Sequence, residues 1–325
     1  MKTYIKKAVV GIMALSMAAS ISISEAKAET SPETSQNVDV LTHNVYFMPH
    51  SLYPNWGQVQ RAKLIPEADY FQGHDIVILN ELFEEDASKV LFKEMEDTYP
   101  NHTPVLGRSK QGWDQTTGNY RAAAIEDGGV SIASKWPIKK QEQHFYKNGC
   151  GVDGAANKGF VYVEILKNNK PVHVIGTHMQ SEDGACVKGK DKDIRETQMA
   201  EIRNFIKEKE IPKDEPVIIG GDLNVNKGTE EYQNMFANLN ASKPDAFDGW
   251  HKTWDTKTNS IAKYNYPEWP PEYLDYILLD KDHAQPKNWT NTAIKAKSPT
   301  WTVKSWGKSY SYNDYSDHYP IQAGE

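Results

Sequence analysis

The sequence lacks several features that would place the chain in a membrane or divide it into modules. After residues 8–23, no stretch is apolar enough to cross a bilayer. There is no Gly/Ser-rich or Pro-rich linker, no internal repeat and no low-complexity tract among the 325 residues. These absences favour a single large domain that is released rather than anchored.

The N-terminal segment is predicted to be a signal peptide. Lysines precede the apolar run over residues 8–23, and residues 26–28 read Ala-Lys-Ala, a small-x-small cleavage pattern. A membrane anchor is the alternative, but the run is short and interrupted by serines. We therefore expect a secreted protein with a signal peptide over residues 1–28, a disordered polar segment over residues 29–36 and one domain over residues 37–325.

Positive charge is scarce for a nucleic-acid-binding protein. The formal net charge is −7, and the signal peptide carries a net +3, so the mature chain carries about −10 (−7 − 3). A protein that binds duplex DNA usually presents a basic face. The composition argues against a nucleic-acid partner, although a local basic patch is compatible with this total.

Only two cysteines are present, Cys150 and Cys186. In a secreted chain they most simply form one disulfide. It would close a loop of 36 residues. The chain-entropy model gives a stabilisation of at most roughly 4 kcal/mol for such a loop. A cysteine metal site is the alternative, and it is disfavoured because no histidine stands close to either cysteine.

The stretch over residues 217–226 reads Val-Ile-Ile-Gly-Gly-Asp-Leu-Asn-Val-Asn. Its β-branched start predicts a buried strand that ends at Gly220 and Gly221. Asp222 and Asn224 stand two residues apart, so in extended chain they would project from the same face. An ordinary Asx-type turn explains the same residues equally well.

Other segments indicate more strands than helices. Helices are predicted over residues 59–71, broken at Pro66, over 86–95, capped by Asp86, and over 193–209. Strands are predicted over residues 38–47, 75–81, 128–133, 159–165, 172–178 and 274–279. The mixture favours an α/β sandwich over a doubly wound parallel sheet.

Polar residues cluster where the predicted strands end. The set comprises Asn44, Glu81, His178, Asp222, Asn224, Asp275, Asp317 and His318. Taken singly, Asn44 could form a turn, Glu81 could start a helix and His178 could be structural. Asp275 stands inside an apolar strand, where an ionised acid is costly unless it is paired, and His318 is the natural partner.

Together these residue types suit one reaction. Carboxylates and amide oxygens are ligands for Mg²⁺, whereas zinc is disfavoured because no His-x-x-x-His pattern or cysteine cluster occurs. A histidine held by an acid is a general base near neutral pH. A second histidine and an amide can stabilise charge on a phosphoryl oxygen. The set predicts metal-assisted hydrolysis of a phosphodiester by in-line attack of water.

Two sets of sequence blocks carry a family resemblance. The blocks Asn44, Asn80–Glu81, Gly176–His178, Gly220–Asn224, Leu274–Tyr276 and Ser316–His318 follow the order found in the DNase I-like metallophosphodiesterase superfamily. Within it, the chain closely resembles the secreted bacterial neutral sphingomyelinases of the β-haemolysin type. The blocks that carry this second resemblance are Thr42–Tyr46, Tyr53–Gly57, Val105–Ser109, Asn157–Tyr162, Val172–His178 and Tyr312–Pro320.

The resemblance implies an α/β fold, a four-layer α/β/β/α sandwich. It also implies a Mg²⁺-dependent phosphodiesterase, with Co²⁺ or Mn²⁺ as substitutes, that hydrolyses sphingomyelin to ceramide and phosphocholine. Such a protein would be a haemolytic toxin and a monomer, in peripheral contact with the outer leaflet of host membranes. The alternatives are a secreted nuclease of the same superfamily and a non-enzymatic membrane-damaging protein.

The resemblance further implies roles for the residues of the central site. Glu81 would hold the Mg²⁺, with Asn44 nearby and Asp317 beside the metal. His318 would be the general base, oriented by Asp275.

The remaining central residues would act on the phosphate. Asp222 and Asn224 would position metal-bound water and the phosphate. His178 would stabilise the transition state or help to protonate the departing ceramide oxygen.

Two further sites follow from the resemblance. Glu126 and Asp127 match an edge metal site, although Glu85 stands where the family usually has Asn. Trp306 looks like the tip of a membrane-contacting hairpin, and Trp301 either contacts lipid too or packs in the core. Because Gly307 follows Trp306 where the family often has a second large apolar residue, we expect weak insertion.

Overall fold

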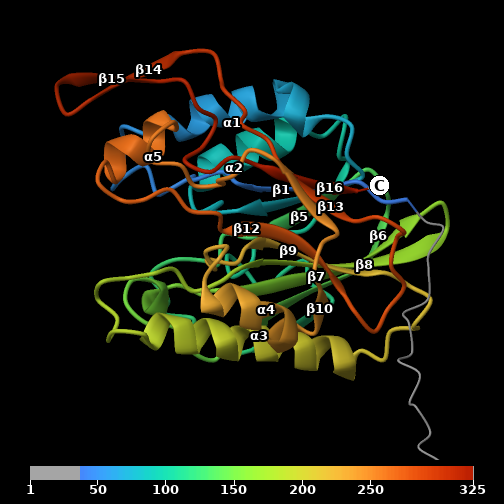
Figure 1. Ribbon diagram of the computed structural model, residues 1–325. Coiled ribbons are helices and arrows are strands. Elements are labelled where there is room, and N and C mark those ends of the chain that lie inside the picture. Colours follow the sequence, from blue (N-terminus) through green and yellow to red (C-terminus); the bar gives the residue numbers. More distant parts are fainter. Residues whose placement is uncertain (1–36, 325) are drawn as a thin grey trace, which may run out of the picture. The chain divides into compact units, whose positions relative to one another are not determined.

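The computed structural model describes residues 37–324. The predicted signal peptide and the predicted disordered segment lie outside the described residues. Two seven-stranded sheets pack face to face, and helices cover their outer faces (Figure 1). This arrangement confirms the predicted four-layer α/β/β/α sandwich.

The first sheet lies under the helices α1 (Gln58–Glu67) and α2 (Glu85–Glu94). Its strand order is β11 (Ala246–Gly249), β13 (Thr290–Ala293), β16 (Ile321–Gly324), β1 (Val40–Asn44), β2 (Ile76–Asn80), β5 (Ser131–Ser134) and β3 (Asn101–His102). The central strands β1 and β2 are parallel, which places Asn44 opposite Asn80. Their polar ends therefore lie at the same edge of the sheet.

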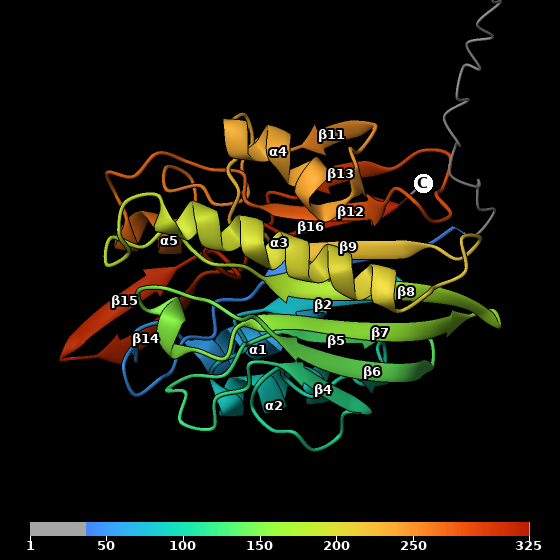
Figure 2. The ribbon, with the colours of Figure 1, turned by 90° about the horizontal axis from the view of Figure 1, so that it is seen from below.

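The second sheet is covered by α3 (Lys190–Glu208) and α4 (Glu230–Leu239), and Figure 2 shows α3 crossing its outer face. Its strand order is β10 (Ala241–Ser242), β12 (Asp275–Asp280), β9 (Val217–Asp222), β8 (Lys170–His178), β7 (Gly159–Lys167), β6 (Ile138–Phe145) and β4 (Gln115–Gly118). The turn between β7 and β8 has Asn168 and Asn169 at φ of 51° and 62°, as a tight two-residue hairpin requires.

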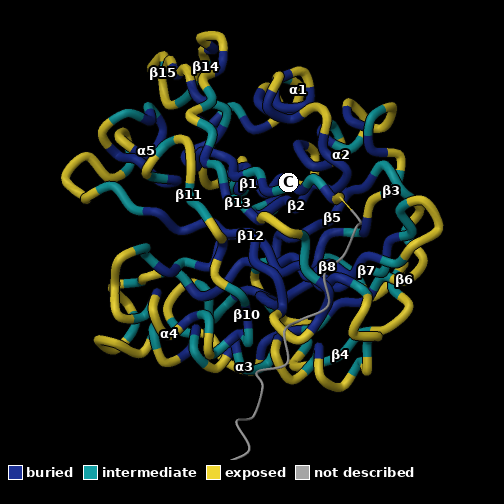
Figure 3. Tube along the Cα trace, turned by 45° about the vertical axis from the view of Figure 1, so that its right-hand side comes forward, coloured by how far each residue is buried: buried dark blue, intermediate teal, exposed yellow. Residues whose placement is uncertain are grey.

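The core lies between the two sheets, where the trace is buried (Figure 3). Gly220 and Gly221 do not end the strand, as the sequence predicted, because β9 continues to Asp222. A Cβ on Gly220 would lie 2.7 Å from Ile78 Cδ1 of the facing sheet. A Cβ on Gly221 would lie 1.9 Å from the carbonyl oxygen of Thr177 on the neighbouring strand. Glycine is therefore required at these two positions because neighbouring parts of the chain pack closely against them, and not because the chain turns there.

Two predicted helix features are wrong in detail. Helix α2 begins at Glu85 with Glu84 at the N-cap, so Asp86 lies in the first turn and does not cap the helix. Helix α1 includes Pro66 and ends one residue later, at Glu67. A proline near the C-terminal end of a helix interrupts few further hydrogen bonds, which is why the helix tolerates it.

Smaller elements complete the chain. They are the 3-10 turns η1 (Asp69–Phe71) and η2 (Asp153–Ala155), the helix α5 (Ser260–Asn265) and a separate hairpin of β14 (Trp301–Ser305) and β15 (Lys308–Tyr312). The predicted disulfide between Cys150 and Cys186 is confirmed. Among residues 37–324, no helix combines the length and the apolar character that crossing a bilayer requires.

Candidate active site

Strand register gathers the predicted site residues into two facing rows. In the second sheet, His178 at the end of β8 is opposite Asp222 at the end of β9, and Asp222 is opposite Asp275 at the start of β12. In the first sheet, Asn44 ends β1 and Glu81 directly follows β2. Because the two sheets pack face to face, the two rows meet at one end of the sandwich.

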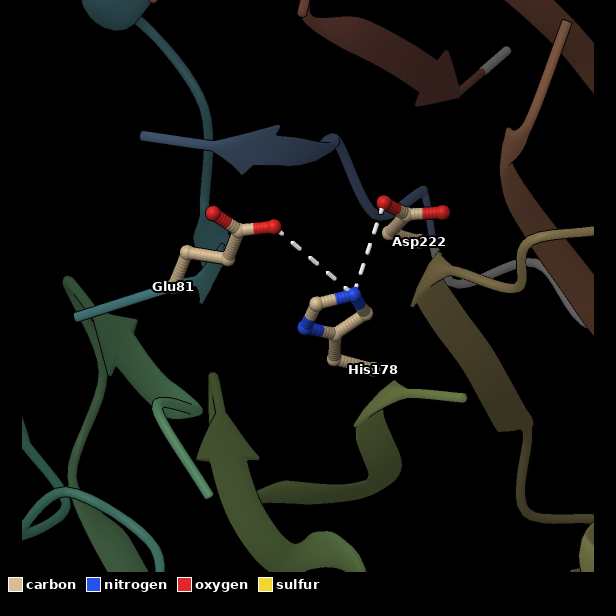
Figure 4. Close-up of side chains that lie close together, drawn as sticks. All are labelled: Glu81, His178 and Asp222. Carbon is tan, nitrogen blue, oxygen red and sulfur yellow. Dashed lines mark ion pairs between the residues drawn. The ribbon is translucent and has the colours of Figure 1, made fainter. Parts of the chain in front are cut away.

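Hydrogen bonds join the rows across the sheets. The side-chain amide of Asn44 donates to Glu81 Oε1 at 2.9 Å and to Asp222 Oδ2 at 3.1 Å. The Nε2 atom of His178 lies 3.8 Å from Glu81 Oε1 and 3.7 Å from Asp222 Oδ2 (Figure 4). Asn80 bridges the sheets as well, since it donates to Thr177 O at 2.9 Å and accepts from Asp222 N at 3.1 Å.

The predicted pairing of Asp275 with His318 is present. His318 Nδ1 lies 2.8 Å from Asp275 Oδ2, and His318 Nε2 lies 3.7 Å from Asp222 Oδ2. Burial alone lowers the pKa of His318, but the carboxylates of Asp275, Asp222 and Asp317 outweigh it and raise the pKa well above its usual value. The orienting acid thus lies on one side of the ring, and the other nitrogen faces the centre of the site.

The buried acids at the centre of the site, Glu81 and Asp317, are not fully neutralised by positive charges of the protein. Burial, followed by the charge of Asp317, raises the pKa of Glu81. Burial also raises the pKa of Asp317, against the opposing charges of His318 and Arg61. Glu81 Oε2 is buried without a hydrogen-bond partner. The free oxygen of Glu81 and the nearby carboxylate of Asp222 fit a hard divalent cation.

Glu81 is held in an unusual backbone conformation. Its φ is 59°, in the left-handed region, and so are those of Tyr46 (52°) and Asn224 (53°) at the same end of the sandwich. A non-glycine residue in this region costs about 1–2 kcal/mol. Such strain clusters at functional sites, where the side chain must point in one required direction.

Lys158 is a site residue that the sequence analysis did not identify. Its ammonium is buried and lies 3.3 Å from His178 Nε2, 2.9 Å from Asp153 Oδ2 and 2.8 Å from Met179 O. Burial, and then the charge of Lys158, lower the pKa of His178 to about 3. His178 is therefore neutral at physiological pH. Nothing in the sequence pattern around Lys158 signals that this lysine is buried.

Arg61 was also missed, and it is fully buried in α1. Its guanidinium donates to the carbonyl oxygens of Trp56 (2.8 Å), Val45 (2.5 Å), Tyr46 (2.6 Å) and Tyr315 (3.0 Å). It thus ties the loop that follows Asn44 to the loop that precedes Asp317. Sequence offers no signal for this role, because an arginine on an amphipathic helix normally faces solvent.

Asn224 does not project beside Asp222 from an extended segment. It lies beyond the end of β9, and its main-chain N–H donates to Asp222 Oδ1 at 3.0 Å. Its side-chain amide donates to Met179 O at 3.1 Å. The Asx-type turn is thus present, and the same-face argument is wrong because the chain turns after Asp222.

The predicted edge residues have hydrogen-bond and ion-pair partners outside the central cluster. Asp127 accepts from Arg108 Nε at 2.9 Å and from Gly129 N at 2.8 Å, and Glu85 pairs with Lys89 at 2.7 Å. Burial raises the pKa of Asp127 to about 7 against the lowering effect of Arg108. Within the described part of the chain, the groups that could hold a metal are Glu81 with His178 and Asp222, and Asp222 with Asp275 and His318. A metal at Glu126 and Asp127 stays a prediction.

The two candidate membrane tryptophans differ in exposure. Trp301 is only 3% exposed, and its indole donates to Asp314 O at 3.0 Å, so its predicted lipid contact is wrong and the core alternative holds. Trp306 is 62% exposed at the tip of the β14–β15 hairpin. Its φ of 50°, with Gly307 at 71°, places both in the left-handed region that a two-residue turn requires.

Comparisons with known proteins agree with this geometry. The model of the Endonuclease/Exonuclease/phosphatase family matches residues 41–318. Sphingomyelinase C of Listeria ivanovii is 52% identical over 297 residues, which are 91% of this chain and 89% of the relative. Phospholipase C of Staphylococcus aureus is 51% identical over 318 residues, which are 98% and 96% of the two chains. The crystal structure of a beta toxin mutant from Staphylococcus aureus, with bound magnesium ions, matches with a TM-score of 0.88 and 53% identity, covering 89% of this chain and 100% of that one.

Proposed function

The chain belongs to the endonuclease/exonuclease/phosphatase family, and within that family we propose that it is a secreted sphingomyelinase that hydrolyses sphingomyelin to ceramide and phosphocholine. The observation that carries the proposal is the meeting of the His318–Asp275 pair with Glu81, Asn44 and Asp222 in one buried site. Relatives named sphingomyelinase C and phospholipase C support the choice of substrate. Lysis of host cells would follow from loss of sphingomyelin in their outer leaflet.

Magnesium is the cation we assign to the centre. Glu81 and Asp222 would hold it, with Asn44 and Asp317 beside them, and the magnesium ions of the related beta toxin structure support this assignment. A bound Mg²⁺ would supply a Lewis acid for a phosphoryl oxygen and positive charge that offsets the surrounding carboxylates.

The residues of the chain divide the remaining work. Because the positive charge of the cation would counter the acids that raise the pKa of His318, its Nε2 can take a proton from the attacking water while Asp275 holds its Nδ1–H and stabilises the imidazolium that forms. The water oxygen bonds to phosphorus, and the bond from phosphorus to the ceramide oxygen breaks on the opposite side. The departing oxygen takes a proton from solvent, which the neutral imidazole of His178 would relay, and the proton on His318 returns to solvent. The amide of Asn44 and the ammonium of Lys158 provide positive potential where negative charge develops on the phosphoryl oxygens.

The decisive assay measures phosphocholine release from liposomes. With Mg²⁺ we expect rapid release from sphingomyelin and much slower release from phosphatidylcholine, with no release in EDTA and recovery when Mg²⁺ is restored. Nicking of plasmid DNA without phosphocholine release would instead support the nuclease alternative. Cell lysis by a protein that releases no phosphocholine would support a non-enzymatic membrane-damaging role.

Membrane contact is a further part of the proposal, and Trp306 is its anchor. Trp306 does not stabilise the turn, because its backbone is in the left-handed region, where Asn is well tolerated and Asn-Gly is the preferred pair in a hairpin. Its exposed ring at the hairpin tip instead suits the headgroup region of a bilayer.

Trp306→Asn should therefore separate membrane binding from turn formation. We expect sedimentation with sphingomyelin liposomes to weaken by roughly tenfold or more, because the indole no longer buries its apolar surface. The melting temperature should be unchanged or raised, since the new turn is Asn-Gly. Hydrolysis of a water-soluble phosphocholine ester should stay at the wild-type rate. Equal loss on liposomes and on the soluble ester would assign Trp306 to the active site instead.

A further inference from the structure

An aromatic corner lies directly beside the catalytic pair and has no role in the mechanism above. It is formed by Trp254, Tyr266, Trp269 and Glu272. The backbone of Trp254 makes isolated β-bridges with Glu272 on one side and with His318 on the other. Its indole also acts as a hydrogen-bond donor to Asp317, which helps to lower the pKa of that acid. The corner is thus connected to the catalytic centre through both main chain and side chain.

The ring of Tyr266 and the main chain of Trp269 are held in place, and both side chains remain open to solvent. The ring centroids of Trp254 and Tyr266 lie 5.3 Å apart at an interplanar angle of 59°. Trp269 N donates to Tyr266 O at 3.2 Å, and Thr256 Oγ1 donates to Trp269 O at 2.5 Å. Tyr266 is nevertheless 50% exposed and Trp269 is 43% exposed. Fixed aromatic side chains with free surface beside a catalytic site suit the binding of a ligand.

Glu272 gives the corner a negative charge. Glu272 accepts from Asn226 Nδ2 at 3.2 Å, and it forms no ion pair with any residue in the described range 37–324. Burial and the neighbouring Glu182 raise its pKa, whereas the charge of Lys252 and a hydrogen bond from the side chain of Trp269 act in the opposite direction. Burial first, and then the charges of Asp317 and Glu81, raise the pKa of Tyr266. The electrostatic field of the catalytic acids therefore reaches the open face of Tyr266.

We propose that Tyr266, Trp269 and Glu272 form the subsite for the quaternary ammonium group of the substrate and make the enzyme selective for choline esters. The inference rests on the proposed function, since it names the headgroup that the same site reads. A quaternary ammonium has no N–H to donate and is attracted to aromatic faces, with a carboxylate supplying longer-range attraction. A primary ammonium is strongly hydrated and gains less from such a surface. The two-carbon linker of phosphocholine keeps the ammonium close to the phosphate, as the position of Trp254 between Glu272 and His318 requires.

Soluble substrates test the subsite without interference from membrane binding. We compare p-nitrophenyl phosphocholine with p-nitrophenyl methyl phosphate, which lacks the cation, in the presence of Mg²⁺. Trp269→Leu and Glu272→Gln should each lower kcat/KM for the choline ester by about tenfold and leave the methyl ester unchanged. Trp269→Phe should restore part of the loss, because a smaller aromatic face remains. Tyr264→Leu, in α5 and 52% exposed, is the matched control and should affect neither substrate, because its ring packs on Trp56 and Tyr310 instead.

Direct binding gives a readout that needs no turnover. Calorimetric titration of the wild type with choline chloride in EDTA should show binding that both variants weaken by roughly fivefold or more. Equal loss of kcat/KM on the two esters would overturn the subsite, since it would indicate a structural role. Binding of choline that is the same in wild type and variants would overturn it too. If the wild type hydrolyses neither ester, the proposed function fails, and the binding measurement still decides the subsite.

Discussion

Replacing His318 with Gln is expected to lower kcat for sphingomyelin by about 10³-fold to 10⁴-fold, because the general base is lost. The imidazole is held at 2.8 Å by Asp275 on one nitrogen, which leaves only Nε2 to face the attacking water. Glutamine offers hydrogen bonds from a similar position but no basic nitrogen near neutral pH. The measurement is phosphocholine release at saturating Mg²⁺ and at a substrate concentration well above KM, so that binding does not limit the rate.

Asp275→Asn is the companion variant, since it keeps the size of the side chain and removes its charge. We expect a loss of about 10²-fold to 10⁴-fold, because the imidazole loses both its orientation and the stabilisation of its charged form. The double variant should lose little more than His318→Gln alone, since the two residues act as one unit. Retention of a tenth of the wild-type rate by His318→Gln, in a protein of unchanged melting temperature, would remove His318 from the role of general base.

Replacing Glu81 with Gln is expected to abolish the stabilisation of the protein by Mg²⁺. A ligand at a concentration of 100 times its Kd stabilises the fold by about 2.7 kcal/mol. For a domain of this size that corresponds to a rise in melting temperature of about 5 °C. The Gln variant keeps the oxygen that accepts from Asn44 but loses the carboxylate that would hold the cation. The rate of phosphocholine release should fall together with the loss of this Mg²⁺-dependent rise in melting temperature.

The same variant should be more stable than the wild type in EDTA. The pKa of Glu81 is raised in the folded protein by burial and by Asp317. The folded state therefore holds this proton more tightly than the unfolded chain, and ionised Glu81 destabilises the fold as pH rises above the unfolded value of about 4.3. We expect the advantage of Glu81→Gln to be larger at pH 8 than at pH 6. Differential scanning calorimetry at both pH values, with and without Mg²⁺, measures all of these quantities.

A matched control for this experiment is Glu164→Gln. Glu164 belongs to β7, pairs with Lys140 at 2.7 Å and lies opposite His173, five residues along β8 from His178. Replacing Glu164 should leave the rise in melting temperature caused by Mg²⁺ unchanged. A Glu81→Gln protein that gains as much stability from Mg²⁺ as the wild type would show that the cation binds elsewhere.

Local sequence was sufficient to predict which polar residues lie at the ends of the central strands, although β9 continues past Gly220 and Gly221 to Asp222. Apolar β-branched runs that stop at a polar residue mark a strand that leaves the core, and this pattern holds for His178, Asp222 and Glu81. Burial of an acid within such a run also predicted the partner of Asp275, because an unpaired charge would be too costly. The layered arrangement came from the resemblance rather than from periodicity.

Local sequence did not predict which of Trp301 and Trp306 is buried. Both are tryptophans in the same hairpin, and nothing in their neighbours distinguishes a buried ring from an exposed one. Trp301 is buried because it lies against Trp56 and Tyr312, whereas Trp306 occupies the turn, where no other part of the described chain covers it. Lys158 and Arg61 were missed for the same reason, since their partners are carbonyl groups and side chains that are distant in sequence.

The sequence by itself determined which residues could carry the chemistry, that they stand at strand ends, and that one disulfide was available. The tertiary structure alone decided that β8, β9 and β12 pair in the register that aligns His178, Asp222 and Asp275. It also decided that the facing sheet presents Asn44 and Glu81 to them. Propensity and periodicity act over a few neighbouring residues, whereas register and sheet packing are set by contacts between segments far apart in the chain.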